Sequence, residues 1–100
     1  MKGYVYILKC NDDSYYVGST KYLKLRISQH QAGEGCRYTA KRLPVELCYF
    51  EEHEHIGLAF EREHQIKRWS KAKKKALVER NIESLKDLAW GFSLRRRKLS

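Results

Sequence analysis

The sequence predicts a single α+β domain in which a small antiparallel sheet of about three strands is flanked by helices. Three observations lead to this prediction. The chain has 100 residues, which is long enough for one modest core and too short for two. Two strand-like stretches near the N-terminus predict a hairpin. Stretches with helical spacing of apolar residues then lie on both sides of a third strand-like segment, which gives the order β-β-α-β-α-α-α.

The three strands are predicted from alternation and composition. In residues 4–9, Val5 and Ile7 fall on one face and Tyr6 on the other. The polar stretch CNDDS precedes YYVG and lacks the Asn-Gly or Asp-Gly of a two-residue turn, so we expect a hairpin with a longer loop. The third strand is predicted over residues 45–52, after the loop GEGCRYTAKRLP.

The first helix is predicted over residues 21–32, with Ser19 or Thr20 as its cap. Leucine and isoleucine recur along it at the spacing of one helical face. His30 lies on this apolar stripe, and Arg26 lies beside it. A charge in such a place is costly without a partner, so both residues are candidates for a functional site.

The second helix is expected from Ile56 or Gly57 to Trp69. Leu58 and Trp69 are among the residues assigned to its buried stripe. Glu63 falls inside the same apolar arc. A carboxylate is the least expected side chain there, which makes Glu63 a third candidate.

The C-terminal part completes the predicted domain. A short basic helix is expected over residues 71–80 and a final helix near residues 85–92. Residues 1–92 are therefore expected to form one domain, and residues 93–100 a basic tail.

The positive charge is concentrated in the second half of the chain. The formal net charge is +9. Residues 1–61 hold 8 basic and 8 acidic side chains, whereas residues 62–100 hold 13 basic and 4 acidic ones. This asymmetry favours a polyanionic partner, because cations that neutralise phosphates release counterions. Both DNA and RNA fit this charge distribution. A basic surface that serves only solubility is the other interpretation.

Several classes of protein are disfavoured by the composition. No apolar run approaches the roughly 20 residues needed to span a bilayer, and the strand-like N-terminus argues against a signal peptide. Three scattered cysteines predict reduced thiols and a cytoplasmic protein. The absence of a CxxC pair in the sequence argues against structural zinc.

Five residues stand out for chemistry, two on the hairpin and three on the helices. They are Tyr6, Tyr16, Arg26, His30 and Glu63. A single carboxylate suits Mg²⁺, which often takes one or two protein carboxylates and completes its shell with water and phosphate. An arginine clamps phosphate oxygens, and a tyrosine or histidine near a metal-bound water can move its proton. The set therefore suits metal-assisted chemistry on a phosphodiester.

Each of these residues also fits a purely structural role. Tyr6 and Tyr16, taken alone, fit packing aromatics of a strand. His30 fits a structural histidine whose ring nitrogens are satisfied. Arg26 and Glu63 fit a partly buried ion pair.

The same residues carry a resemblance to a known family. The sequence resembles the GIY-YIG nuclease superfamily, and most of all its small standalone bacterial members. YVY at residues 4–6 matches the GIY element, and YVG at residues 16–18 the YIG element. LKLRISQH supplies the family's arginine and histidine, and AFEREHQIKRWSKAKKKALV its glutamate helix. The match runs in order from about residue 3 to residue 80.

The resemblance implies a metal-dependent DNA endonuclease that selects structure instead of sequence, with a role in DNA repair or recombination. It implies that Glu63 binds one Mg²⁺ or Mn²⁺ ion and that Tyr6 helps to deprotonate the attacking water. Arg26 would stabilise the transition state. Tyr16 and His30 would position phosphate, water or one another.

The resemblance also implies which residues contact the substrate. The residues expected to bind substrate are Tyr38, Lys67, Lys71, Lys73, Lys74 and Lys75. The lysines would contact the DNA backbone, and Tyr38 would be an active-site aromatic or else a loop anchor. Tyr4 departs from the family pattern, because it stands in place of the glycine of GIY. Asn81 is the candidate for an asparagine that some members place in the site.

The alternative function is a nucleic-acid-binding module that keeps the fold without cleaving. A protein-interaction domain that uses the basic tail is a third class. We expect a monomer, and a protein partner that targets the domain to its substrate is compatible with the sequence.

Overall fold

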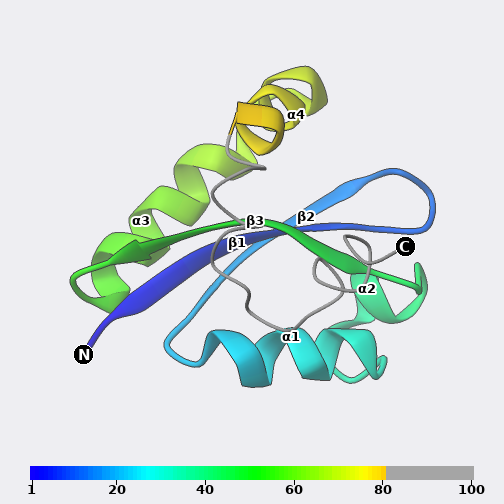
Figure 1. The fold of residues 1–100 in the computed structure, drawn as a ribbon, viewed down its shortest axis with the longest axis horizontal. Coiled ribbons are helices and arrows are strands. Elements are labelled where there is room, and N and C mark those ends of the chain that lie inside the picture. The colour runs from blue at the N-terminus through cyan, green and yellow to red at the C-terminus, as the bar shows by residue number, and fades with distance from the viewer. Residues whose placement is uncertain (81–100) are drawn as a thin grey trace.

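The computed structural model describes residues 1–80, with elements in the order β-β-α-α-β-α-α (Figure 1). They are β1 (Gly3–Lys9), β2 (Tyr15–Thr20), α1 (Leu23–Gln31), α2 (Arg37–Ala40), β3 (Glu46–His53), α3 (Ile56–Lys67) and α4 (Lys71–Arg80). The α+β class and the predicted strands are confirmed, as are the three helices predicted within this range. Asn81, the helix predicted near residues 85–92 and the tail predicted over residues 93–100 lie outside the described residues.

The sheet is antiparallel with the strand order β2-β1-β3. In the central strand, Tyr6 lies opposite Gly18 of β2 on one side and opposite Phe50 of β3 on the other. A register shift between Ile7 and Leu8 interrupts the pairing with β3. Because β2 pairs only with β1 in the described part of the chain, its outer side is an open sheet edge.

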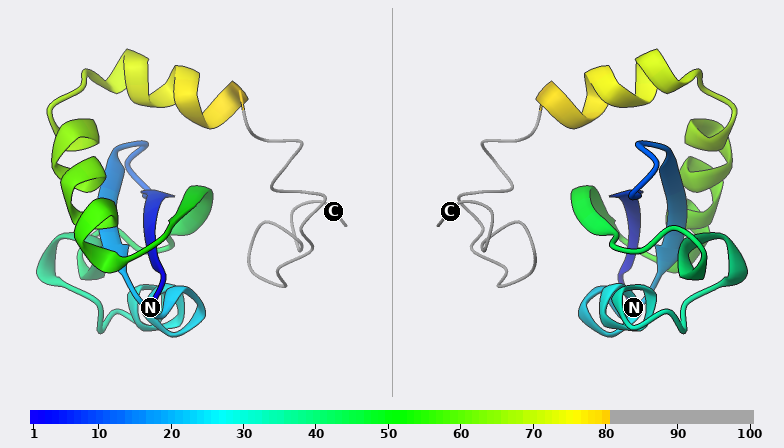
Figure 2. Two further views of the ribbon diagram at one scale, coloured as in Figure 1. Left: turned by 90° about the vertical axis from the view of Figure 1, so that its left-hand side faces the viewer. Right: turned by 90° about the vertical axis from the view of Figure 1, so that its right-hand side faces the viewer.

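Helices cover both faces of the sheet, so the domain has three layers (Figures 1 and 2). On one face, Val5 and Ile7 form a core with Ala59 and Ile66 of α3, and α4 adds Val78. On the other face the core packs against α1. It consists of Tyr6, Leu8, Cys10, Leu23, Ile27, Val45 and Leu47. The alternation predicted for the first strand is therefore confirmed, with both of its faces buried.

The connection between α1 and β3 differs from the prediction of a continuous loop, because it contains the short helix α2. The predicted cap of α1 also needs correction. The helix begins after Tyr22, which makes no side-chain capping bond, and the Tyr22 N–H donates to Thr20 Oγ1 at 3.0 Å. Ser19 lies in β2 and does not cap the helix, since its side chain has a partner on α3.

The buried stripe of α3 is narrower than predicted. Ala59, Glu63 and Ile66 are buried, whereas Leu58 is 40% exposed. Leu58 precedes Ala59 by one residue, so it is turned about 100° away around the helix axis. Assigning Leu58 to the buried stripe was therefore wrong. The helix also ends at Lys67, two residues before the predicted end.

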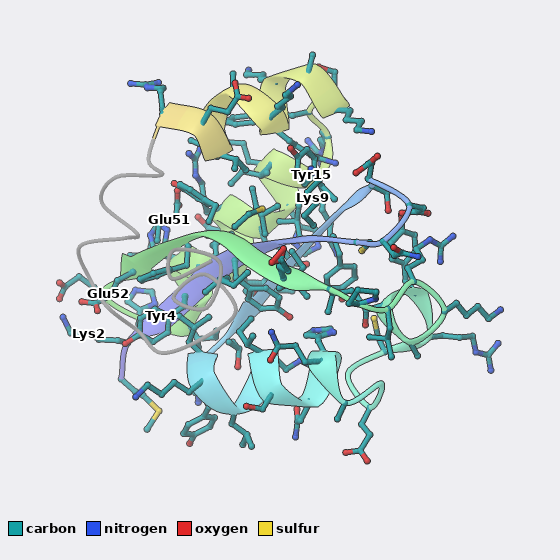
Figure 3. All side chains as sticks on the ribbon, turned by 45° about the vertical axis from the view of Figure 1, so that its right-hand side comes forward. Lys2, Tyr4, Lys9, Tyr15, Glu51 and Glu52 are labelled. Carbon is teal, nitrogen blue, oxygen red and sulfur yellow. The ribbon has the colours of Figure 1, made fainter. Side chains whose placement is uncertain are left out.

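An ion pair joins β1 to β3 at one end of the sheet, and two further tyrosines pack against the cores on its two faces (Figure 3). The Lys2 ammonium donates to Glu52 at 2.6 Å, joining the start of β1 to the end of β3. Tyr15 packs against the core under α3, and Tyr4 against the core over α1. None of the helices within residues 1–80 is long and apolar enough to cross a membrane.

Candidate active site

Tyr6 and Gly18 form the centre of the candidate site. They are paired residues on β1 and β2, and the Tyr6 side chain is only 1% exposed. A methyl group on Gly18 would collide with the hydroxyl and ring of Tyr6. The missing side chain at Gly18 therefore lets the Tyr6 hydroxyl extend over β2 toward the open edge of the sheet.

His30 connects Tyr6 to α2 through a buried chain of hydrogen bonds. The Tyr6 hydroxyl lies 2.8 Å from His30 Nε2, and Thr39 Oγ1 lies 2.8 Å from His30 Nδ1. The Thr39 hydroxyl also lies 3.4 Å from the Cys36 carbonyl; when it donates there, its oxygen accepts the proton of His30 Nδ1. This assignment leaves Nε2 with a lone pair that accepts the Tyr6 O–H. His30 and Thr39 are both fully buried.

Burial sets the protonation states of this pair. It lowers the pKa of His30 to about 4, with the nearby Arg26 charge acting in the same direction. Burial raises the pKa of Tyr6 to about 12, although Arg26 opposes the shift. Near neutral pH the tyrosine therefore holds its proton and the imidazole is uncharged. A neutral imidazole beside a phenol can accept the phenol's proton.

Arg26 reaches the same place from α1. Its guanidinium donates to the Gly35 carbonyl at 3.1 Å and to Gln29 Oε1 at 3.2 Å. The side chain is half-buried, so it is less enclosed than the predicted buried position. Its charge acts on both Tyr6 and His30, which places the cation beside the proton pathway.

Glu63 lies on the other face of the sheet and contacts Ser19, the residue after Gly18. The Ser19 hydroxyl donates to Glu63 Oε1, and the Lys67 ammonium lies 2.6 Å from Oε2. Successive strand residues point to opposite faces, so Ser19 meets α3 while Gly18 lies under Tyr6. Glu63 is 7% exposed, and its charge raises the pKa of Tyr6 in addition to the larger effect of burial. The Glu63 carboxylate on one face of the sheet therefore acts electrostatically on the Tyr6 hydroxyl on the other face.

An ion pair between Arg26 and Glu63 fits the sequence, but the structure pairs Glu63 with a different cation. Within residues 1–80, Glu63 pairs with Lys67, and no ion pair joins it to Arg26. Arg26 is satisfied by uncharged oxygens. No carboxylate of the described residues therefore neutralises its positive charge, which is the state that suits phosphate binding.

The donors at Glu63 fit a hard divalent cation. Mg²⁺ prefers oxygen ligands and keeps several waters, and Glu63 supplies a carboxylate next to the Ser19 hydroxyl. One carboxylate oxygen already attracts the Lys67 ammonium, whose side chain is 47% exposed and free to turn away. Across the described residues no three His, Cys, Asp or Glu side chains gather as ligands, so Glu63 would be the one ionised protein ligand.

Tyr16 and Tyr38 extend the site toward α2. The Tyr16 ring centroid lies 6.4 Å from that of Tyr6 and 5.2 Å from that of His30. Tyr38 stacks on Tyr16 at 5.9 Å, and its hydroxyl donates to Ser14. The Arg42 guanidinium covers the Tyr38 ring at 3.7 Å. Tyr38 therefore anchors the α2 segment to the hairpin and touches the site through Tyr16.

The predicted substrate-binding lysines divide into two groups. Lys67 joins the site through Glu63. The other lysines belong to α4, where Lys73 lies over the Trp69 ring at 4.2 Å and Lys74 is half-buried. In the described part of the chain, no hydrogen bond or ion pair connects Lys71, Lys73, Lys74 or Lys75 to the five candidate residues. The structure therefore brings the catalytic candidates together, whereas the lysines of α4 make no such contact with them within residues 1–80.

Three residues of the site escaped the sequence analysis. Thr39 orients His30, Ser19 orients Glu63, and Gly35 lies so close to the His30 ring that a methyl group there would collide with it. Small hydroxyl and glycine residues are common in turns, so nothing local marks them. The one indication in the sequence was position, since Thr39 and Gly35 lie in the segment that directly follows the helix of His30.

The buried neutral state of His30 predicts a specific acid sensitivity. Because its folded pKa of about 4 lies below the unfolded value of 6.5, the unfolded chain binds more protons between these pH values. The free energy of unfolding should therefore fall by about 3 kcal/mol from this group as the pH is lowered from 7.5 to 4. Urea unfolding at both pH values measures how strongly the free energy of unfolding depends on pH, and this dependence should be weaker in His30→Gln than in the parent. Equal pH dependence in the two proteins, or an NMR titration of the ring near 6.5, would contradict the prediction.

Comparison with known proteins identifies the family of the chain. Residues 2–76 match the family model described as the GIY-YIG catalytic domain. The UPF0213 protein NP_0776A of Natronomonas pharaonis is 47% identical over 75 residues, which cover 75% of this chain and 88% of that protein. The UPF0213 protein SH2523 of Staphylococcus haemolyticus is 44% identical over 78 residues, which cover 78% of this chain and 95% of that protein.

A solved structure shares the fold as well. The solution NMR structure of the UPF0213 protein BH0048 from Bacillus halodurans has a TM-score of 0.52 and 38% sequence identity. The alignment covers 79% of this chain and 84% of that one. These relatives come from archaea as well as bacteria, so the resemblance is wider than the bacterial group expected from the sequence. The chain belongs to the GIY-YIG family and, within it, to the UPF0213 proteins.

Proposed function

We propose that this protein is a divalent-metal-dependent endonuclease that hydrolyses phosphodiester bonds of DNA, with Glu63 as the ligand of one Mg²⁺ or Mn²⁺ ion. The observation that carries the proposal is that polar groups on the two faces of the sheet contact two successive residues of the edge strand, Gly18 and Ser19. A tyrosine–histidine hydrogen bond and a guanidinium lie on one side, and a buried carboxylate lies on the other. A family assignment to a catalytic domain supports the same conclusion.

Tyr6 and His30 would handle the proton of the attacking water. The Tyr6 hydroxyl is already hydrogen-bonded to a neutral imidazole nitrogen, 2.8 Å away. As the phenol oxygen takes a proton from water, its own proton passes to His30 Nε2. Thr39 fixes the ring so that Nε2 faces the tyrosine. The bound cation would supply charge stabilisation at phosphate oxygens and a more acidic water.

Arg26 would bind the phosphate on which negative charge builds. Its guanidinium is half-buried, and within residues 1–80 its hydrogen bonds go to the uncharged oxygens of Gln29 and Gly35, so its charge is available to an anion. Preorganised donors of this kind stabilise a transition state more than the ground state. Tyr16, which stacks on Tyr38 and lies tilted against the His30 ring, would hold the phosphate or the water in place.

The basic second half of the chain would hold nucleic acid without reading its sequence. Lys67 and the lysines of α4 are suited to phosphate oxygens, which carry no sequence information. We therefore propose structure-selective cleavage by a monomer in DNA repair or recombination. RNA is the competing substrate.

A panel of labelled substrates tests the proposal. Hairpin, flap, single-stranded, duplex and RNA oligonucleotides are incubated with the protein in Mg²⁺, in Mn²⁺ and in EDTA, and products are separated on denaturing gels. We expect cleavage of at least one DNA with metal and none in EDTA. Absence of cleavage of every substrate, or equal cleavage in EDTA, would refute the proposed function.

A non-catalytic binding module is the second candidate, because most of the charge surplus lies outside the site. The two candidates predict different mutants. For a binding module, replacing the lysines at 71, 73, 74 and 75 would abolish function and Glu63→Ala would not. For an endonuclease, Glu63→Ala would abolish cleavage while nucleic-acid binding persists.

A further inference from the structure

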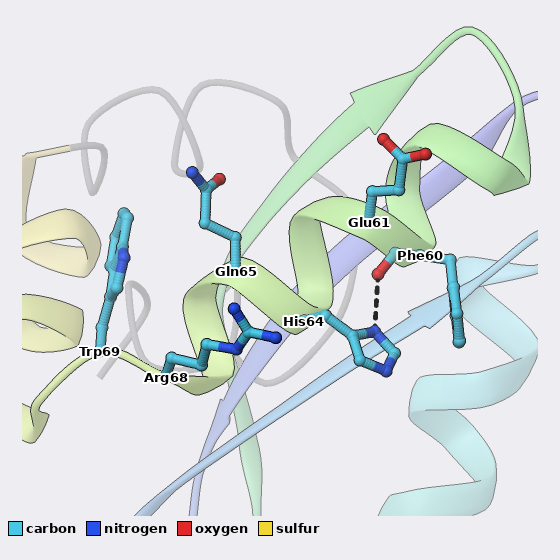
Figure 4. A pocket seen from close by; sticks show the side chains of 6 residues that line it. All are labelled: Phe60, Glu61, His64, Gln65, Arg68 and Trp69. Carbon is cyan, nitrogen blue, oxygen red and sulfur yellow. Dashed lines mark hydrogen bonds between the residues drawn. The ribbon is translucent and has the colours of Figure 1, made fainter.

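We propose that the outer surface of α3 binds an unstacked nucleotide base beside the scissile phosphate, so that the protein selects strands with unpaired nucleotides over continuous duplex. This inference rests on the proposed nuclease function. The surface is a shallow groove with a cavity volume of about 450 Å³ (Figure 4). Its lining residues are Phe60, Glu61, His64, Gln65, Arg68 and Trp69.

Phe60 provides an aromatic face at one end of this groove. Its side chain is 54% exposed, which leaves a large apolar surface in contact with water. The His64 ring lies 4.2 Å from it, tilted by 56°. The His64 Nδ1–H donates to the Phe60 carbonyl at 2.9 Å, which fixes the imidazole beside the phenyl ring (Figure 4). The pair is therefore a preformed ledge of two rings on which a base can stack.

Cations accompany the rings along the groove. Arg68 lies in it between His64 and Trp69 (Figure 4). The Lys73 ammonium lies 4.2 Å from the Trp69 ring centroid, and the Arg62 guanidinium 5.2 Å from it. Glu61 is the one acidic residue that lines the groove. Stacking rings with adjacent cations are the combination that single-stranded nucleic acid requires, since each base is joined to a phosphate.

The helix places the ledge next to the candidate active site. Phe60 precedes Glu63 by three residues, and Lys67 follows Glu63 by four, so the three side chains are neighbours along one side of α3. His64 directly follows Glu63. A nucleotide whose phosphate lies at Glu63 would thus have its base within reach of Phe60. A base inside a duplex has both faces covered, so only an unpaired nucleotide can use the ledge.

Binding in EDTA tests the inference without requiring cleavage. Fluorescence anisotropy is measured with a labelled DNA single strand and with a blunt duplex of the same sequence, at one fixed salt concentration. In Phe60→Ala, affinity for the single strand should fall by about tenfold or more, and affinity for the duplex by less than about twofold. Phe60→Tyr should keep the affinity of the parent, because it keeps the ring.

Leu58→Ala is the matched control. Leu58 is also an exposed apolar residue of α3, at 40%, and it does not line the groove. This variant should bind both probes like the parent. Thermal unfolding of each variant checks that the fold is intact, which we expect because Phe60 lies at the surface.

Three results would overturn the inference. They are an unchanged single-strand affinity in Phe60→Ala, equal losses for both probes, and a parent protein that binds neither probe. Failure of the proposed function is a separate outcome. It would appear as no cleavage in metal while the selective effect of Phe60→Ala on single-strand binding in EDTA persists.

Discussion

Glu63→Gln is expected to reduce phosphodiester cleavage by about 10³-fold or more, because it removes the one ionised ligand proposed for the metal. Glutamine is close to glutamate in size and can still accept the Ser19 hydroxyl. The Lys67 ammonium loses its partner, but its side chain is 47% exposed and can be hydrated. The loss should therefore arise from chemistry and not from unfolding.

Initial rates on the preferred substrate in Mg²⁺ measure this effect, and Mn²⁺ binding followed by electron paramagnetic resonance measures its cause. Glu54→Gln, which changes an exposed carboxylate just before α3, is the control and should keep both rate and binding. If Glu63→Gln cleaves at the parent's rate, or binds Mn²⁺ as tightly, Glu63 is not the metal ligand.

Tyr6→Phe is expected to lower the cleavage rate by about 10²- to 10³-fold, because it removes the hydroxyl that would pass the proton to His30. The ring itself remains across Gly18, so the packing of the α1 face is kept. His30 Nε2 loses its buried partner, which costs about 1–3 kcal/mol in the free energy of unfolding. Single-turnover rates and urea unfolding separate the two effects.

Tyr49→Phe provides the comparison for this prediction. Tyr49 is a buried tyrosine on the other face of the sheet, and its hydroxyl is bonded to Glu51. Removing that hydroxyl should affect stability and leave cleavage unchanged. Mn²⁺ binding should be normal in Tyr6→Phe, in contrast to Glu63→Gln. A Tyr6→Phe protein as active as the parent would exclude the hydroxyl from proton transfer.

The site residues that could be predicted from the sequence are the polar ones that interrupt an apolar helical stripe. His30 and Glu63 fall on apolar stripes of helices, and the structure buries both of them. Tyr6 and Tyr16 were indistinguishable from packing aromatics until the helices supplied polar partners. The three strands and the helices α1, α3 and α4 followed from periodicity and composition, whereas the four-residue helix α2 was not predicted.

Other parts depend on contacts between distant segments, which periodicity does not contain. Thr39 bonds His30 from a segment that resembles a loop, and Ser19 bonds Glu63 across 44 positions of sequence. Such pairings follow from the layering of the fold.

The attachment of α2 to the hairpin has a consequence for the stability of the site itself. Arg42 is bonded to Asp12, and Tyr38 to Ser14, all at or near the surface. Exposed contacts of this kind contribute little free energy, so the α2 segment should open locally at a lower cost than the sheet unfolds. Each opening would remove Thr39 from His30 and free the imidazole to rotate. The orientation of His30, the proposed proton acceptor, therefore depends on a segment that exposed contacts attach to the hairpin, and the proposed chemistry can fail while the sheet stays folded.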